Sequence, residues 1–137
     1  ISDLGTRLIS AAIKQGIEVV PVPGASAVTA ALTISGFPSD SFVFDGFIPQ
    51  KKGRQKKLSE LSREERTIVI YESTYRIEKF LNELNEHMPE RLLAVCRELT
   101  KKFEEVWRGT PGQILEGFKE KNTKGEFVVV ISPKNWK

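Results

Sequence analysis

The sequence predicts an α/β fold in which helices flank a mixed β-sheet. Two observations support this prediction. Apolar residues alternate between helical and strand-like spacing along most of the chain, and glycine and proline turn signals separate the segments. A chain of 137 residues is long enough for one domain with a hydrophobic core. Its 39% hydrophobic and 28% charged residues are typical of a globular protein rather than a disordered one.

The amino-terminal part predicts a helix, a strand and a second helix. Apolar side chains recur at helical spacing over residues 4–15, which predicts an amphipathic helix. The β-branched run at 17–22 is typical of a buried strand. After a sharp Pro-Gly break, Ser26 begins a helix of small residues at 27–34, which Gly36 ends.

Strands and helices continue to alternate up to the end of the sequence. Strands are predicted at 42–48, 67–71, 91–96, 104–108 and 127–132, and helices at 54–62, 75–86 and 111–121. The strand at 67–71 has no polar residue after its start, as expected when both faces of a sheet are covered. Gly, Pro, Ser and Asp cluster at 36–41, which predicts a boundary between the end of one α/β domain (1–37) and a second α/β domain (38–137).

Charge indicates one candidate surface for RNA. The net charge of +3 is too mild to predict nucleic-acid binding, but five cations fall within seven residues. They are Lys51, Lys52, Arg54, Lys56 and Lys57. Such a segment could neutralise phosphates without reading sequence, and the alternative is a solvated loop.

Other classes of site and location receive no support from the sequence. The single cysteine, Cys96, lies in an apolar run and is interpreted as a core residue in a reducing compartment. His87 has no histidine or cysteine nearby, so no metal site is predicted. No stretch approaches the roughly 18 apolar residues of a membrane span, and we expect a cytoplasmic protein.

Seven short motifs occur in an order that resembles the tetrapyrrole methylase superfamily, and most of all its ribosomal RNA (cytidine-2′-O) methyltransferase branch. They lie at 1–5, 22–27, 44–49, 71–76, 97–101, 104–109 and 124–126. The resemblance covers the whole chain but about half of a family member. The chain departs from the family pattern at Leu4, where proline is usual, and at Thr74 and Tyr75, where proline and histidine are usual.

The resemblance implies that S-adenosylmethionine binds between two α/β domains, of which this chain supplies most of the second. The implied cofactor-binding residues lie at strand ends and helix starts: Ser26, Ala27, Tyr71, Glu72, Leu99, Thr100, Thr110 and Pro111. Ligands of open α/β sheets gather outside the carboxyl ends of strands, and helix starts offer unpaired N–H groups. The structural alternatives are an ordinary strand-to-helix connection, a solvated strand end and a helix cap.

A polar cluster at 97–101 is the candidate for catalysis. Methyl transfer from a sulfonium depends on positioning and on removal of the acceptor's proton. Lys101 with a lowered pKa, or Glu98, could assist, with substrate positioning favoured over a base role. A surface ion pair is the alternative. We assign Arg76 and Arg97, with the basic segment, to RNA binding.

The resemblance implies methyl transfer to the 2′-hydroxyl of a cytidine in small-subunit ribosomal RNA, performed by a homodimer. We expect this chain alone to be inactive and to bind the cofactor weakly or not at all. One alternative is a superfamily enzyme acting on a tetrapyrrole or a protein. Another is a non-catalytic RNA-binding or assembly module.

Overall fold

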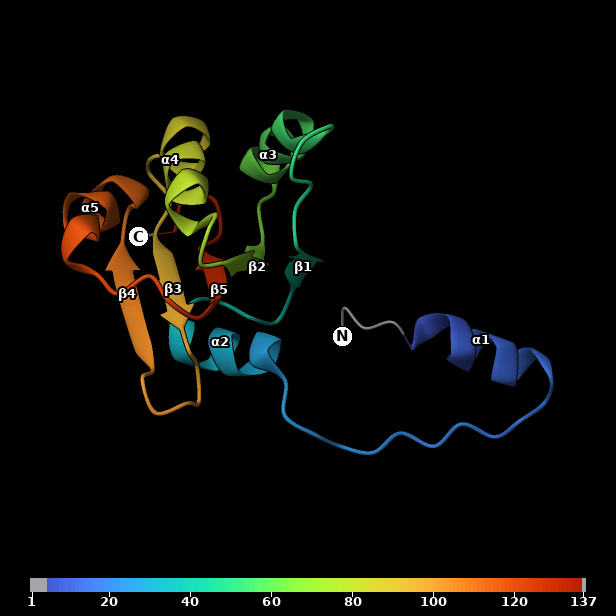
Figure 1. The fold of residues 1–137 in the computed structure, drawn as a ribbon. Helices are drawn as coiled ribbons and strands as arrows, with labels where there is room; N and C mark the ends of the chain where they lie inside the picture. The colour runs from blue at the N-terminus through green and yellow to red at the C-terminus, as the bar shows by residue number, and fades with distance from the viewer. Residues whose placement is uncertain (1–4, 137) are drawn as a thin grey trace.

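The computed structural model describes residues 5–136 and confirms the predicted α/β class. Its elements are α1 (Thr6–Lys14), α2 (Ala27–Ser35), β1 (Phe42–Gly46), α3 (Arg54–Arg63), β2 (Thr67–Ser73), α4 (Ile77–His87), β3 (Leu93–Arg97), β4 (Glu105–Gly109), α5 (Pro111–Glu116), the 3₁₀ turn Phe118–Glu120 and β5 (Glu126–Ile131) (Figure 1). Most of these elements lie within a few residues of their predicted positions. The last predicted helix divides at Gly117 into α5 and the 3₁₀ turn.

The five strands form one mixed sheet in the order β1-β2-β5-β3-β4. Strand β1 is parallel to β2, whereas β5 is antiparallel to both β2 and β3, and β4 is antiparallel to β3. Strands β1, β2 and β3 therefore run in the same direction, and the loops that follow them emerge together. We call this side of the sheet its carboxyl end. The opposite end holds the starts of these three strands and the residues after β5.

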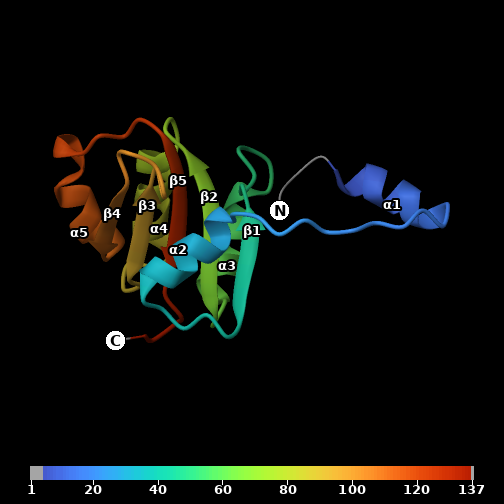
Figure 2. The ribbon, with the colours of Figure 1, turned by 90° about the horizontal axis from the view of Figure 1, so that it is seen from below.

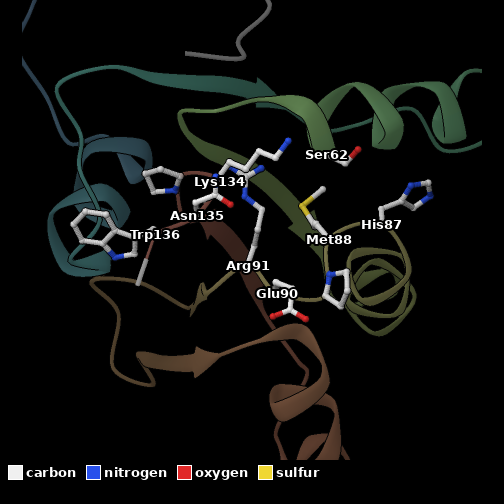
Figure 3. A pocket seen from close by; sticks show the side chains of 10 residues that line it. Ser62, His87, Met88, Glu90, Arg91, Lys134, Asn135 and Trp136 are labelled. Atoms are coloured by element: carbon white, nitrogen blue, oxygen red, sulfur yellow. The ribbon is translucent and has the colours of Figure 1, made fainter.

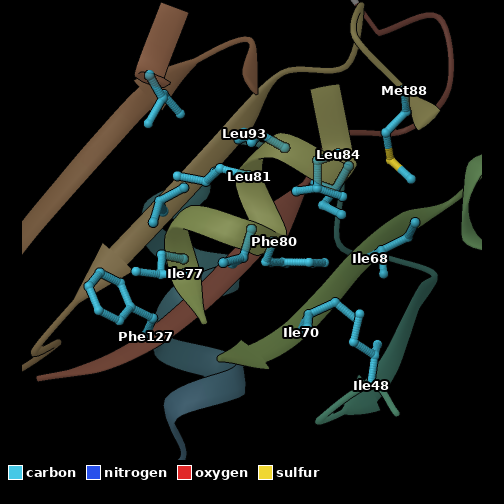
Figure 4. Close-up of a cluster of buried hydrophobic side chains, with 14 of the residues drawn as sticks. Ile48, Ile68, Ile70, Ile77, Phe80, Leu81, Leu84, Met88, Leu93 and Phe127 are labelled. Carbon is cyan, nitrogen blue, oxygen red and sulfur yellow. The ribbon is translucent and has the colours of Figure 1, made fainter. Parts of the chain in front are cut away.

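Three layers enclose the hydrophobic core. Helices α3, α4 and α5 cover one face of the sheet and α2 covers the other (Figures 1 and 2). Successive strand residues serve alternate faces, so Ile68 and Ile70 pack under α4 while Val69 packs against α2. The side under α4 is the larger cluster, centred on the fully buried Phe80 (Figure 4).

The predicted strand at 17–22 is wrong. These residues belong to no strand, and their apolar side chains face solvent, with Val20 70% exposed and Val22 89% exposed. A strand needs a neighbour for its backbone hydrogen bonds, and no strand within residues 5–136 lies beside this segment. Helix α1 also buries none of its residues and stands apart from the sheet in both views (Figures 1 and 2).

Helix α2 is attached firmly to the sheet. Val28, Ala31 and Leu32 are buried against it, and the guanidinium of Arg108 donates a hydrogen bond to the carbonyl oxygen of Ser35 at 2.9 Å. The helix precedes the boundary predicted at 36–41, yet it forms one packed unit with the strands that follow.

Candidate functional site

Two pockets adjoin at the carboxyl end of the sheet. The β2 pocket, about 450 Å³, is bounded by the end of β2, by Phe47 and by the start of β5. The α2 pocket, about 550 Å³, is bounded by the start of α2 and by the turn after β3. Ala27 and Glu126 line both pockets, so the two are neighbours, and we refer to them together as the hollow. Volumes of this order suit a small-molecule ligand.

Sequence reasoning placed several cofactor candidates correctly around this hollow. Tyr71 and Glu72 line the β2 pocket, and the α2 pocket is lined by Ser26, Ala27, Leu99, Thr100 and Lys101. Parallel strand direction explains this grouping, because β2 and β3 end on the same side. Whether these residues hold the cofactor remains a prediction.

Thr110 and Pro111 do not join the hollow. They follow β4, which runs against β3, and Gly109 pairs with Leu93 at the opposite end of the sheet. The Thr110 hydroxyl accepts a hydrogen bond from the Gln113 N–H, and the Gln113 side chain accepts one from the Thr110 N–H. This capping box accounts for Thr110 as the start of α5.

Ser73 is a further candidate residue, which the predicted set of cofactor-binding residues leaves out. Its hydroxyl oxygen is buried and has no hydrogen-bond partner within the described chain, although the residue lines the β2 pocket. Its neighbour Thr74 is fully engaged, donating to the Gly125 carbonyl at 2.6 Å and accepting from the Gly125 N–H at 2.9 Å. Buried polar groups are nearly always paired, so the unpartnered Ser73 hydroxyl is a candidate for a ligand contact. Its place at the end of a buried strand was the only signal in the sequence.

Glu72 and Arg76 neutralise one another beside the β2 pocket. Oε1 of the buried Glu72 accepts from Arg76 Nε at 2.7 Å and from the Ser73 N–H at 2.8 Å. The Arg76 guanidinium also lies 5.9 Å from the centre of the Phe47 ring. Tyr71 packs edge-on against Phe47, and burial raises the pKa of its phenol, which therefore stays protonated.

Lys101 is held as a cation. Its Nζ lies 2.7 Å from Glu126 Oε2 and 3.0 Å from Glu98 Oε1. Hydrogen bonds to these two carboxylates raise its pKa, which disfavours the base role and agrees with the preferred role in positioning. The pKa of Glu98 is lowered, first because the Glu126 N–H donates to it and then because Lys101 does. Glu98 and Thr100 both adopt positive φ angles, 48° and 65°, which non-glycine residues rarely do.

The basic segment divides into exposed and buried cations. Lys51, Lys52 and Lys56 are exposed, and Lys57 pairs with Asp45 at 3.0 Å. Arg54 is buried, and its Nε donates to Glu83 Oε1 at 2.8 Å. The prediction that Arg54 contacts RNA is wrong, because this guanidinium ties the start of α3 to α4.

Arg97 is also an interior residue. It is 3% exposed, and its Nη1 donates to the Lys124 carbonyl oxygen at 2.9 Å. The guanidinium lies 3.4 Å from the Glu105 carboxylate on the next strand. The prediction that Arg97 contacts RNA is therefore wrong, whereas Arg76 remains partly exposed beside the hollow.

Metal and thiol chemistry find no support in the described part of the chain. No group of three or more His, Cys, Asp or Glu side chains within residues 5–136 could hold a metal ion. Cys96 is buried, and desolvation raises its pKa to about 11, which confirms it as a core residue. Among the same residues no helix has the length and apolarity needed to cross a bilayer.

Comparison with proteins of known sequence identifies close relatives. Ribosomal RNA small subunit methyltransferase I of Synechocystis sp. is 46% identical over 134 residues, which cover 96% of this chain and 48% of the relative. The protein of the same name from Halalkalibacterium halodurans is 42% identical over 132 residues, covering 96% and 46%. The chain thus spans about half the length of these relatives.

Solved structures share the fold at low sequence identity. A cobalamin biosynthetic enzyme, cobalt precorrin-4 methyltransferase, superposes with a TM-score of 0.67 at 16% identity, covering 94% of this chain and 58% of that one. Uroporphyrin-III C-methyl transferase from Thermus thermophilus, complexed with S-adenyl homocysteine, gives 0.63 at 16% identity, covering 96% and 60%. The family model for Tetrapyrrole (Corrin/Porphyrin) Methylases matches residues 1–115. The chain therefore belongs to the tetrapyrrole (corrin/porphyrin) methylase family.

Proposed function

We propose that this chain is the substrate-facing half of a methyltransferase that moves a methyl group from S-adenosylmethionine to the 2′-hydroxyl of a cytidine in small-subunit ribosomal RNA. One observation supports it above the others. The two pockets adjoin at the carboxyl end of the sheet in a chain that is 46% identical to a ribosomal RNA small subunit methyltransferase I. Open α/β sheets bind their ligands at this end.

The residues of the hollow fit S-adenosylmethionine. The unpartnered Ser73 hydroxyl and the aromatic wall of Tyr71 and Phe47 suit an adenosine, which offers both a flat ring and hydrogen-bonding edges. The backbone of 24–27 enters the nine-residue helix α2, whose first N–H groups suit a carboxylate. When bound, the cofactor supplies an electrophilic methyl group.

Different charged groups on the α2 pocket position the substrate and remove its proton. Lys101 stays an ammonium at neutral pH, so in this proposal it orients an anionic group of the substrate rather than taking a proton. Glu126 lies on the wall that both pockets share, where its carboxylate can accept the proton of a 2′-hydroxyl. Glu98 holds Lys101 and the Glu126 N–H in place.

The exposed lysines of the basic segment would bind RNA phosphates without selecting sequence. Lys51 and Lys52 lie in the connection that follows β1, which leaves the carboxyl end of the sheet. We also propose a cytoplasmic homodimer in which this chain needs a preceding amino-terminal domain, with this chain alone inactive.

The test joins this chain to the amino-terminal half of its parent protein and supplies labelled S-adenosylmethionine with unmodified small ribosomal subunits. We expect label in a 2′-O-methylated cytidine after digestion of the RNA to nucleosides. Changing Lys51, Lys52 and Lys56 to Glu should weaken RNA binding while cofactor binding, measured by calorimetry, stays unchanged. If the cofactor binds but no label reaches RNA, the proposed substrate is wrong.

A further inference from the structure

The loops at the carboxyl end of the sheet carry two exposed aromatic side chains that have no structural role. Tyr75, after β2, is 95% exposed, and Phe103, after β3, is 64% exposed. Single exposed apolar residues are common on proteins, so exposure alone indicates nothing. Their positions distinguish them, because both lie in loops that border the two pockets.

Strand direction places these two loops at the same end of the sheet, and each is bonded to the residues that lead into β5: Thr74 to Gly125 and Lys101 to Glu126. Because β1, β2 and β3 run in the same direction, the residues after each of them emerge at one end of the sheet. Only β5 separates β2 from β3 in the sheet order, so the two strands are roughly 10 Å apart, at roughly 4.8 Å per neighbouring strand. A short stretch of single-stranded nucleic acid can therefore reach both loops.

A basic residue lies next to each aromatic side chain in the sequence. Arg76 follows Tyr75 and pairs with Glu72. Lys101, which pairs with Glu98 and Glu126, and Lys102 precede Phe103, and two glutamates follow it. The Lys102 ammonium lies 5.4 Å from the centre of the Phe103 ring. Aromatic rings interleaved with cations are the arrangement by which proteins hold single-stranded nucleic acid, since bases stack on the rings and phosphates lie near the cations.

The exposed lysines after β1 extend this arrangement along the same end of the sheet. Lys51 and Lys52 continue the line of cations away from Phe103, beyond the loop that holds Tyr75. The two pockets lie between the aromatic loops, where a nucleotide held on both sides would present its ribose to Glu126.

We propose that Tyr75 and Phe103 are stacking residues for two bases of the substrate RNA, one on each side of the nucleotide that enters the hollow. This inference rests on the proposed function and adds to it the residues that fix the substrate strand. The prediction concerns ring stacking, which is separable from the phosphate contacts of the lysines because only the latter change the salt dependence of binding.

The test measures binding of a fluorescein-labelled oligocytidine single strand to the chain joined to its amino-terminal half. Tyr75→Ala and Phe103→Ala should each raise the dissociation constant about tenfold, while the slope of log affinity against log salt stays unchanged. Tyr75→Phe and Phe103→Tyr retain a ring and should bind as the parent does. Both residues are exposed, so thermal unfolding should show that every variant folds.

Trp136 provides a matched control. It is 41% exposed and follows β5 at the opposite end of the sheet, so Trp136→Ala should leave RNA affinity unchanged (Figure 3). Parent-like binding by both alanine variants, or an equal loss in Trp136→Ala, would overturn the inference. If the unaltered protein methylates RNA in either case, the proposed function survives; if it binds no RNA, both fall.

Discussion

Both ends of the sheet contain a hollow, but within residues 5–136 only the carboxyl end has a buried side-chain oxygen without a hydrogen-bond partner. The opposite-end pocket, about 440 Å³, is similar in size to the β2 pocket. At its centre the buried Arg91 donates to four carbonyl oxygens, those of Leu61, Glu64, Arg66 and Ser132 (Figure 3). The carboxyl end instead has the buried, unpartnered Ser73 hydroxyl, whereas non-glycine residues with positive φ angles occur at both ends, at Glu98 and Thr100 and at Asn135.

The two pockets have similar volumes but different hydrogen bonding, so volume alone does not identify a binding site in this fold. Arg91 ties the end of α3, the start of β2 and the residue after β5 together, so its hydrogen bonds serve the stability of the fold. Ser73 instead leaves a buried hydroxyl oxygen without a hydrogen-bond partner in the described chain, and local rules of this kind are broken most often at functional sites.

The largest expected effect on the free energy of unfolding is at Arg91. Arg91→Ala leaves four carbonyl oxygens of the opposite end without their donor, so we expect the free energy of unfolding to fall by about 3 kcal/mol. Arg91→Lys should recover little, because one ammonium cannot reach all four acceptors. Urea denaturation measures both, and an unchanged midpoint for Arg91→Ala would show that the two ends do not differ in this way.

Variants of Lys101 test whether this residue acts at the carboxyl end as a cation. Lys101→Ala should lower methyl transfer about tenfold, whereas Lys101→Arg should retain most of the activity, because arginine also carries a positive charge. If Lys101 were instead a general base, the arginine variant would be as inactive as the alanine variant. The measurement is kcat/KM for labelled methyl transfer by each variant between pH 6 and 9.

A smaller effect is expected at Ser73, with opposite signs for folding and binding. Ser73→Ala removes an unsatisfied buried hydroxyl, so stability should stay the same or rise slightly. Affinity for S-adenosylhomocysteine should fall about fivefold, which corresponds to about 1 kcal/mol. Calorimetry and thermal unfolding of the same sample measure the two changes, and a loss of stability without a loss of affinity would contradict a ligand role.

The last prediction concerns the pH dependence of stability, which the buried Cys96 on β3 affects. The pKa of Cys96 is raised from 9.0 to about 11, so the buried thiol contributes stability below pH 9 that is lost as the pH rises toward 11. Between pH 7 and pH 10 the parent should lose about 1 kcal/mol more than Cys96→Ala does. Equal pH dependence of the two proteins in urea denaturation would show that water reaches the thiol.

Most of the sheet and the helices around it could be predicted from sequence because their apolar spacing reports directly on burial. The strand predicted at 17–22 fails for a physical reason: β-branched residues indicate strand propensity but not the presence of a neighbouring strand. The packing of α2 likewise needs the tertiary structure, and we propose that the domain boundary lies before Ala27 rather than at 36–41.

The location of the candidate site at the strand ends could be predicted from sequence, but the interactions of its individual residues could not. Motif order gave Tyr71, Glu72 and the turn after β3, and strand direction brings them together. It could not show that Arg54 is buried against Glu83, because the sequence does not reveal which cations of a basic segment are exposed and which form buried ion pairs. Nor could it reveal Ser73, because a missing hydrogen bond is visible only in three dimensions.

A tryptophan placed in the pocket at each end of the sheet tests most directly whether the cofactor binds at the carboxyl end. Ala27 is exposed and lines both pockets there, while the half-buried Ser62 lines the opposite-end pocket. Each residue is replaced by tryptophan in the chain joined to its amino-terminal half, and S-adenosylhomocysteine binding is measured by calorimetry. We expect Ala27→Trp to abolish binding and Ser62→Trp to retain it. Unchanged affinity in folded Ala27→Trp, or loss of binding in Ser62→Trp alone, would contradict it.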